Sequence, residues 1–428
     1  MLAQADFTTV VEFSRVSVLA NYLLGTLDAI DADYIDEDHS ISVETLDKAE
    51  SAYLQKRGHL QVRDHEQREL ICRLWSSYLQ KHETTCYVYL QLTHECNLRC
   101  SYCFQASNGY QHRTMAPGTL HNIESRLKRL LKTSCDPARI VIVLYGGEPL
   151  LPKNMNLVLE ALDICKRHGF RLRVITNGIQ LPHYLEILKR SIGVLDGVTV
   201  TLDGARFSHD KVRRTLDGEG TYDRVVSSSK AAMRNGIDVT VRLNVSQDNI
   251  DMLRHSNWRH SDFKYEIHRV EYPLYEKAVS FWQLLELCLN GYISLTELAV
   301  NQVGYFYQIF EEDQAHYPLF GDCLSGSVLL FSPEGAVYDC NEAGTNSVPL
   351  GMVEDDSCSY FESVERYLSG RAFQMEIPCS ECPASPVCGG ACRVRRGDSS
   401  SYKKCPYYSD ISDMLKRYIS WKTGLQGV

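Results

Sequence analysis

The sequence lacks the features that mark membrane and secreted proteins. No uninterrupted apolar stretch approaches the roughly 20 residues that a membrane-spanning helix requires. Residues 1–6 contain no basic segment followed by an apolar core, so we expect no signal peptide. The chain also lacks an excess of positive charge: 54 Asp and Glu outnumber 45 Lys and Arg, which gives a formal net charge of -9 and a pI near 5.9. That balance argues against nucleic acid or an anionic membrane as a partner.

Cysteine, in contrast, is abundant. The chain has 428 residues, of which 16 are cysteines, 44% are hydrophobic and 23% are charged. This length and composition are typical of a globular protein with two or three domains. Cysteines without an export signal point to reduced thiols that bind metal rather than to disulfides, and they indicate a cytoplasmic protein.

Three cysteines form the most informative motif. Cys96, Cys100 and Cys103 lie in a CX3CX2C loop directly after an apolar, β-rich run at residues 86–92. Three thiolates at this spacing can hold three irons of a [4Fe–4S] cube, which leaves the fourth iron free to bind a substrate or cofactor. A structural zinc ion would instead require four closed ligands. Three unrelated buried thiols are the other alternative.

Apolar runs and amphipathic segments alternate from about residue 85 to 290. Strands are expected at residues 86–92, 140–145, 171–176, 197–202, 238–245 and 263–270, and helices at residues 120–131, 156–168 and 222–235, among others. Repeated strand–helix units predict an α/β fold, with a parallel sheet and helices outside it. In barrels of this kind the working residues lie at the C-terminal ends of the strands.

Polar and glycine-rich segments follow several of these strands. Glycine allows close backbone approach to a ligand, and glutamate can accept a hydrogen bond or pair with an ammonium group. A guanidinium can bind a carboxylate through two charged hydrogen bonds. Arg213 and Arg214 are both candidates for this role, and the sequence does not decide between them. Simple turns and solvated surface arginines are the alternatives. The residues concerned are Gly146, Gly147, Glu148, Asn177, Asp203, Arg213, Arg214 and Asn244.

The cysteine loop and these strand-end segments resemble the signature of radical SAM enzymes. The resemblance implies a partial (β/α)6 barrel at residues 85–290 and S-adenosylmethionine (SAM) chelating the free iron. One electron from the cluster would cleave SAM to methionine and a 5′-deoxyadenosyl radical. Tyr102 and Phe104 of the cysteine loop, together with the strand-end residues above, would bind SAM. Within that set, the Gly-Gly-Glu-Pro (GGEP) segment at residues 146–149 would bind the amino group of SAM. One of the two arginines would bind the SAM carboxylate.

The C-terminal cysteines resemble a SPASM domain. They are arranged as CX11GX4C, then CX2CX5CX3C, then a last cysteine, and the first pair flanks a hairpin expected at residues 328–331 and 336–338. A two-site zinc ribbon is the alternative. The resemblance implies two auxiliary [4Fe–4S] clusters: a distal one held by Cys379, Cys382, Cys388 and Cys405, and a proximal one held by Cys323, Cys340 and Cys392. An open iron, Cys358 or Asp322 would complete the proximal cluster, and we favour the open iron.

The expected domains follow from these motifs. Residues 1–84 form a capping or peptide-docking domain, winged-helix-like by resemblance, with helices expected at residues 42–58 (serine-capped) and 67–80. Residues 85–290 form the barrel, and residues 291–320 a linker with a helix. Residues 321–410 form the SPASM domain, and residues 411–428 a C-terminal helix or tail.

Three functions remain open at this point. The first, which the resemblance favours, is a maturase that crosslinks side chains of a ribosomally made peptide through C–C, ether or thioether bonds; an epimerase is a variant of it. The peptide leader would bind the N-terminal domain, and a flavodoxin- or ferredoxin-type protein would donate electrons.

The second is oxidation of Cys or Ser to formylglycine, as in anaerobic sulfatase maturases. Those enzymes carry an aspartate base directly after the second SPASM cysteine, whereas Asn341, which cannot accept a proton, follows Cys340 here. The third is a non-catalytic iron–sulfur or zinc scaffold.

Overall fold

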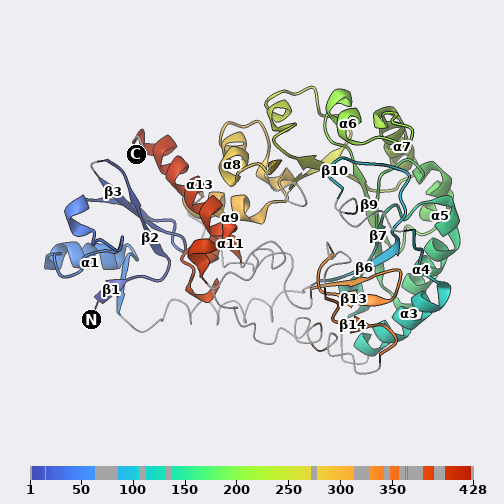
Figure 1. Ribbon diagram of the computed structural model, residues 1–428, viewed down its shortest axis with the longest axis horizontal. Helices are drawn as coiled ribbons and strands as arrows, with labels where there is room; N and C mark the ends of the chain where they lie inside the picture. Colours follow the sequence, from blue (N-terminus) through green and yellow to red (C-terminus); the bar gives the residue numbers. More distant parts are fainter. Residues whose placement is uncertain are drawn as a thin grey trace.

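The computed structural model describes residues 2–14, 16–62, 85–103, 105, 112–131, 136–270, 277–312, 327–341, 348–355, 362, 364, 379–389 and 401–425. Its larger part is a curved sheet with helices around it, and a smaller β-rich part carries the N-terminus (Figure 1). Among the described residues no helix has both the length and the apolar character needed to cross a bilayer.

The large sheet confirms the expected α/β fold. Within the described residues it has nine strands in the order β11-β10-β9-β8-β7-β6-β12-β13-β14, and β6 to β11 are all parallel. The expected strands all occur, with ends shifted by at most one or two residues, as β6 (Cys86–Thr93), β7 (Ile140–Gly146), β8 (Arg171–Thr176), β9 (Leu195–Thr201), β10 (Val239–Val245) and β11 (Lys264–Arg269).

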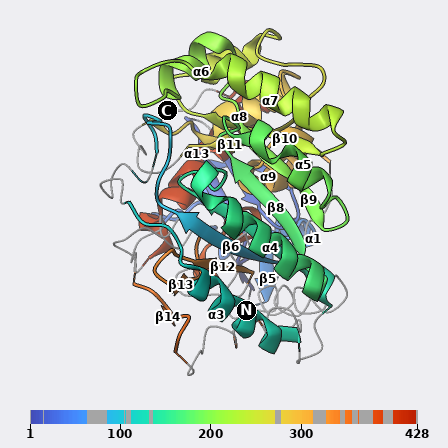
Figure 2. The same cartoon turned by 90° about the vertical axis from the view of Figure 1, so that its right-hand side faces the viewer.

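Helices follow the strands and cover the outside of the curved sheet. They are α3 (Pro117–Leu131), α4 (Met155–His168), α5 (Leu185–Lys189), α6 (Arg206–Val212) and α7 (Tyr222–Arg234). Figure 2 shows α3, α4 and α5 lying over strands β6 to β9. The strands are buried because a parallel sheet of this kind is covered by its crossover helices, and five consecutive residues of β7, Ile140 to Leu144, are at most 1% exposed.

A buried carboxylate ties two of these helices together. Glu124 of α3 is hydrogen-bonded by His168 of α4 at 2.8 Å and lies 3.3 Å from the Lys128 ammonium. Burial by itself would raise the pKa of Glu124, but the hydrogen bonds from His168 and Lys128 lower that pKa to about 2. The carboxylate is therefore ionised across the physiological range.

The hairpin expected in the cysteine-rich region is present and extends the barrel sheet. β12 (Val328–Phe331) pairs parallel to β6, and β13 (Ala336–Tyr338) and β14 (Gly351–Met352) follow antiparallel. Arg126 of α3 donates hydrogen bonds of 2.9 Å to the carbonyl groups of Val353 and Glu354, just after β14. The added strands cover the edge of β6, which would otherwise expose unpaired backbone groups.

The N-terminal part is mainly β-structure. β2 (Thr8–Glu12), β3 (Ser17–Asn21) and β4 (Leu27–Ile30) form an antiparallel sheet, and β1 (Leu2–Gln4) pairs with β5 (Leu60–Val62). The winged-helix-like description stays a prediction, because the helix expected at residues 67–80 lies outside the described residues.

The helix expected at residues 42–58 is shorter than predicted. Helix α1 spans Lys48–Lys56 and its cap is Asp47, not a serine. The Asp47 carboxylate accepts the N–H of Glu50, and the Glu50 carboxylate accepts the N–H of Asp47. This capping box begins the helix at Lys48, because it satisfies N–H groups that no helical carbonyl can reach. Ser42 instead donates its N–H to the carbonyl of Tyr34 in a turn.

The remaining helices lie between the N-terminal sheet and the barrel (Figure 1). They are α8 (Phe281–Leu289), α9 (Asn301–Glu311), α11 (Ser385–Cys388) and α13 (Pro406–Thr423). The helix expected within residues 291–320 is α9. The C-terminal helix, expected from residue 411, begins at Pro406, because proline is favoured in the first turn of a helix and Cys405 stands at the N-cap. Gly25 packs tightly here, since a Cβ on it would lie 2.1 Å from the carbonyl oxygen of Ile309.

Candidate active site

The three-cysteine loop leaves the C-terminal end of β6 and pairs with a distant segment. Leu98, only 1% exposed, anchors the loop in the core and forms a β-bridge with Thr215. Residues 98–101 run beside residues 212–215, with two further N–H···O bonds of 2.8 and 3.0 Å. The segment that follows α6 is therefore part of the site.

Two of the thiols are held in defined surroundings. The Cys96 sulfur accepts the N–H of Leu98 at 3.4 Å and the side-chain amide of Asn177 at 3.8 Å. Burial raises the pKa of Cys96 to about 12 and that of Cys100 to about 11. A bound iron would reverse this effect, because its charge deprotonates a coordinating thiol. Within the described residues, no three His, Cys, Asp or Glu side chains converge on a single metal ion.

The GGEP segment packs against the backbone that leads into this loop. A Cβ on Gly147 would lie 2.1 Å from the carbonyl oxygen of Glu95, and one on Gly146 would lie 2.5 Å from that of Thr93. The N–H groups of Gly147 and Glu148 donate to the carbonyls of Thr93 and Glu95, both at 2.8 Å. The close approach that glycine permits here is thus to the chain itself, and contact with a ligand stays a prediction.

Glu148 joins the ends of two strands. Its fully buried carboxylate accepts the Thr176 hydroxyl at 2.7 Å and the N–H groups of Asn177 and Leu150 at 2.7 and 2.9 Å. Burial raises the pKa of Glu148, and these donors act in the opposite direction. Asn177 in turn donates to the side-chain oxygen of Asn97 at 2.8 Å, inside the cysteine loop. The predicted pairing of Glu148 with an ammonium group stays untested.

Four of the predicted cofactor residues form one network. The Tyr102 hydroxyl donates to the buried Asp203 carboxylate and accepts from the Arg213 guanidinium at 2.6 Å and the Asn244 amide at 3.1 Å. The other oxygen of Asp203 accepts the N–H of Asn244 at 3.0 Å. Burial raises the pKa of Asp203, and the nearby Arg213 opposes that effect. The network brings together the cysteine loop, the end of β9, the segment after α6 and β10.

The structure separates the two candidate arginines. Arg213 is 6% exposed and its guanidinium points into the network, with Nε lacking a hydrogen-bond partner among the described residues. Arg214 is exposed and donates to the carbonyl of Asp210 at 2.9 Å. Because neighbouring residues of an extended segment point to opposite sides, only one of the two can face the site.

Two residues of the site were not assigned a role from the sequence. His209 and Thr221 are fully buried and hydrogen-bonded to each other at 2.9 Å, directly behind Asp203 and Arg213. The position of His209 four residues before Arg213 on a short helix was visible in the sequence. Thr221 lies in the glycine-containing segment at residues 218–223, and the fold brings it there from beyond a turn.

Comparison with known proteins agrees with this geometry. Residues 90–261 match the radical SAM superfamily. This part of the chain is a radical SAM domain. The cysteine-type anaerobic sulfatase-maturating enzyme of Clostridium novyi (strain NT) is 20% identical over 332 residues, covering 70% of this chain and 85% of the relative. The GTP 3′,8-cyclase of Synechococcus sp. (strain CC9902) is 32% identical over 157 residues, 35% of this chain and 42% of the relative.

Solved structures share the fold of this chain. The structure of anSMEcpe with bound AdoMet aligns with a TM-score of 0.60 at 17% identity, over 79% of this chain and 94% of that one. Streptococcus suis SuiB bound to S-adenosylmethionine aligns with a TM-score of 0.53 at 16% identity, over 94% and 100% of the two chains. The family implies a [4Fe–4S] cluster and SAM, and three soft sulfur donors in one loop fit such a cluster.

The enzyme's C-terminal cysteines fall into two places. Cys382, Cys388 and Cys405 are buried. Cys382 lies just before α11, Cys388 ends α11, and Cys405 is the N-cap of α13, which packs against α11. Cys379 precedes them on the same turn, since its carbonyl accepts the N–H of Cys382 at 3.2 Å. Three of the four cysteines predicted for the distal cluster thus lie on one short segment, and Cys405 lies on the neighbouring helix α13, at its N-cap. The distal cluster stays a prediction.

Cys340 lies elsewhere, just after β13. Because β13 is antiparallel to β12 and β12 is parallel to β6, Cys340 lies toward the N-terminal ends of the barrel strands, at the opposite end from Cys96. Cys323, Cys392 and Phe104, together with the alternative ligands Cys358 and Asp322, lie outside the described residues. The proximal cluster stays a prediction.

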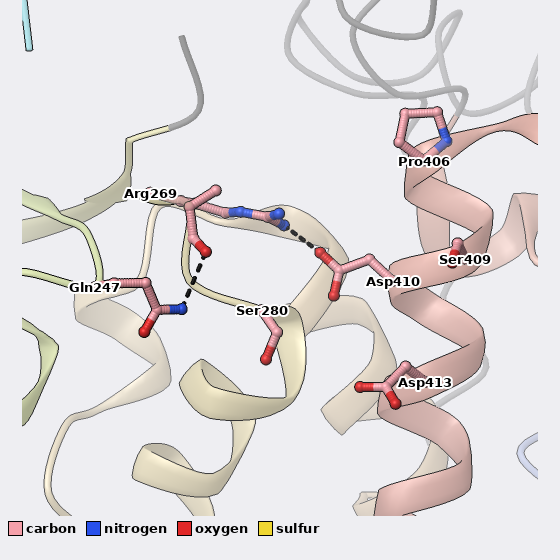
Figure 3. Close-up of a pocket in the computed structure, with 8 residues that line it drawn as sticks. Gln247, Arg269, Ser280, Pro406, Ser409, Asp410 and Asp413 are labelled. Atoms are coloured by element: carbon pink, nitrogen blue, oxygen red, sulfur yellow. Dashed lines mark hydrogen bonds and ion pairs between the residues drawn. The ribbon is translucent and has the colours of Figure 1, made fainter. Parts of the chain in front are cut away.

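An ion pair connects the barrel to α13 beside a polar cavity. The Arg269 guanidinium, at the end of β11, lies 2.7 Å from the Asp410 carboxylate, and the two side chains are 6% and 12% exposed (Figure 3). The second Asp410 oxygen accepts the N–H of Phe281, at the start of α8, at 3.0 Å. The cavity of about 420 Å³ is also lined by Gln247, Ser280 and Asp413. This ion pair connects the strand end to α13, the helix that Cys405 caps.

Proposed function

We propose that this radical SAM enzyme is a maturase that forms an intramolecular side-chain crosslink in a ribosomally made precursor peptide. The observation that carries the proposal is the network of Tyr102, Asp203, Arg213 and Asn244 beside the three-cysteine loop. It sits at the C-terminal ends of parallel strands, where barrels of this type carry their active sites.

Cys96, Cys100 and Cys103 would hold the SAM-binding cluster. When bound, the cluster supplies the electron that cleaves SAM and so yields the radical that removes a hydrogen atom from the peptide. Arg213 would bind the SAM carboxylate, because its buried Nε has no partner among the described residues and a guanidinium suits a carboxylate. Glu148 and Asn177 fix the loops that face the cluster loop.

Related structures support a peptide as substrate. AnSMEcpe has been solved with a bound Cp18Cys peptide, and SuiB with its precursor peptide SuiA. In this chain residues 1–84 would bind the peptide leader, and a flavodoxin- or ferredoxin-type protein would supply electrons. The auxiliary clusters would accept the electron that must leave after the new bond forms.

Oxidation of Cys or Ser to formylglycine is the second candidate, favoured by the sequence relatives among anaerobic sulfatase-maturating enzymes. It is less well supported because Asn341 stands after Cys340, where the sulfatase maturases carry an aspartate base. The carboxamide of Asn341 cannot accept a proton at neutral pH.

The test is anaerobic reconstitution followed by reduction with SAM present. The wild type should release 5′-deoxyadenosine, whereas Cys100→Ala should release none while keeping the C-terminal clusters. Cys382→Ala should instead lose iron and product. With the peptide encoded by a short open reading frame beside the gene as probe, loss of two hydrogens without an aldehyde that reacts with hydrazine indicates a crosslink. An aldehyde would indicate formylglycine, and an unchanged mass with one solvent deuterium would indicate epimerisation.

A further inference from the structure

His209 links Asp203, the acidic residue of the network, to Arg213, the basic one. Its ring is fully buried on α6, and Nδ1 accepts the N–H of Asp203 at 3.1 Å. The other ring nitrogen, Nε2, must then carry the hydrogen, which it donates to the Thr221 hydroxyl at 2.9 Å. The Thr221 hydroxyl in turn donates a hydrogen bond to the backbone carbonyl of Arg213 at 3.0 Å. One ring therefore fixes the backbone of two charged residues.

Both charged side chains converge on the same hydroxyl. Asp203 accepts a hydrogen bond from Tyr102, and Arg213 donates one to it. Tyr102 lies between the second and third cysteines of the three-cysteine loop, so a shift of either charged residue would displace this part of the loop. The backbone N–H of Arg213 also donates to the His209 carbonyl at 2.8 Å, so His209 holds this segment through main chain and side chain.

The environment keeps the His209 ring neutral. Burial and the nearby Arg213 cation lower the pKa of His209 to about 3. A neutral ring has one acceptor and one donor, whereas a protonated ring would have two donors and would lose the bond from Asp203. The Tyr222 ring packs edge-on against the imidazole, with 5.9 Å between the ring centroids.

We propose that His209, acting through Thr221, is a positioning residue that orients Asp203 and Arg213 against Tyr102 and thereby sets the affinity of the enzyme for SAM. The inference rests on the proposed function, in which Arg213 binds the SAM carboxylate. The His209 ring is hydrogen-bonded to Asp203 and Thr221, so it acts on the site through these residues.

Three substitutions distinguish the hydrogen bond made by Nδ1 of His209 from the one made by Nε2. In His209→Asn the amide oxygen replaces Nδ1 and keeps the bond from Asp203, but the side chain is too short to reach Thr221. In His209→Gln the amide nitrogen replaces Nε2 and keeps the bond to Thr221. Thr221→Val preserves shape and removes the hydroxyl. His59→Asn is the matched control, because His59 is also fully buried, in the N-terminal part, where it is hydrogen-bonded to Asp28.

Uncoupled SAM cleavage to 5′-deoxyadenosine gives the first readout. His209→Asn and Thr221→Val should each raise the KM for SAM about fivefold, the factor expected for one lost hydrogen bond, with kcat within twofold and full iron content. The double variant should resemble either single variant, because both remove the same link. His209→Gln should lie closer to the wild type, and His59→Asn should leave the KM unchanged.

Hydrogen–deuterium exchange of the protein without cluster or SAM gives the second readout. The backbone amides of residues 212–215, which pair with the cluster loop, should exchange faster in His209→Asn and Thr221→Val than in the wild type or His59→Asn. An unchanged KM and unchanged exchange in the folded variants would overturn the inference. A wild type that releases no 5′-deoxyadenosine would refute the proposed function, and exchange alone would then decide the positioning role.

Discussion

Gly147→Ala tests the link between the GGEP segment and the cluster loop. An added Cβ would lie 2.1 and 2.5 Å from the carbonyl oxygen and carbon of Glu95, and 2.6 Å from the carbonyl oxygen of His94. All three are backbone atoms, so no side chain can rotate away. Because non-bonded carbon contacts are normally about 3.5 Å or longer, one segment must move by roughly 1 Å.

The cost follows from the bonds that such a shift breaks. The N–H groups of Gly147 and Glu148 would lose their bonds to the backbone of residues 93–95, at about 1 kcal/mol each. Overpacking adds about 1–3 kcal/mol, giving a total of roughly 3–5 kcal/mol. The displaced loop carries Cys96, and a misplacement of about 1 Å near the chemistry can lower a rate about 100-fold.

Gly118→Ala is the control for this prediction. Gly118 lies in the first turn of α3, and a Cβ there would meet no atom within 4 Å. Alanine in a helix is favoured over glycine by up to about 1 kcal/mol, so this variant should be at least as stable as the wild type and equally active. Iron content, the electron paramagnetic resonance of the reduced cluster and 5′-deoxyadenosine release are the measurements. Wild-type values for all three in Gly147→Ala would refute the reasoning.

Further predictions concern charge. Arg213→Lys should weaken SAM binding about tenfold, because lysine cannot make two parallel hydrogen bonds to a carboxylate, whereas Arg214→Lys should bind SAM normally in equilibrium dialysis. The pKa of Glu124 is lowered on folding, so its contribution to stability is present above about pH 4.3 and is lost as the pH falls toward 2. Glu124→Gln should therefore lower the unfolding free energy by roughly 2 kcal/mol at pH 7 and by little at pH 2, in urea titrations. Asp410→Ala should destabilise the protein by roughly 3–5 kcal/mol, since it leaves the Arg269 cation buried without this carboxylate. Replacing both residues by Met and Leu should recover most of that loss in thermal unfolding.

Much of the barrel was predictable because its signals are local. The alternating apolar runs gave β6 to β11 and the helices between them with small errors at the ends. The spacing of Cys96, Cys100 and Cys103 identified the cluster loop without any tertiary information, because three thiols separated by so few residues must lie close together. The start of α1 was misplaced because several serines and acidic residues precede it, and only the reciprocal bonds of Asp47 and Glu50 decide which one caps the helix.

The sequence by itself thus determined the order of strands and helices, the cysteine loop and the set of polar residues at the strand ends. Only the tertiary structure decided which of them meet: Arg213 rather than Arg214 faces Tyr102, and His209 and Thr221 stand behind the pair. It also decided that β12 would pair with β6. The physical reason is that a side chain's direction and a strand's partner depend on contacts between segments far apart in the chain, on which local pattern carries no information.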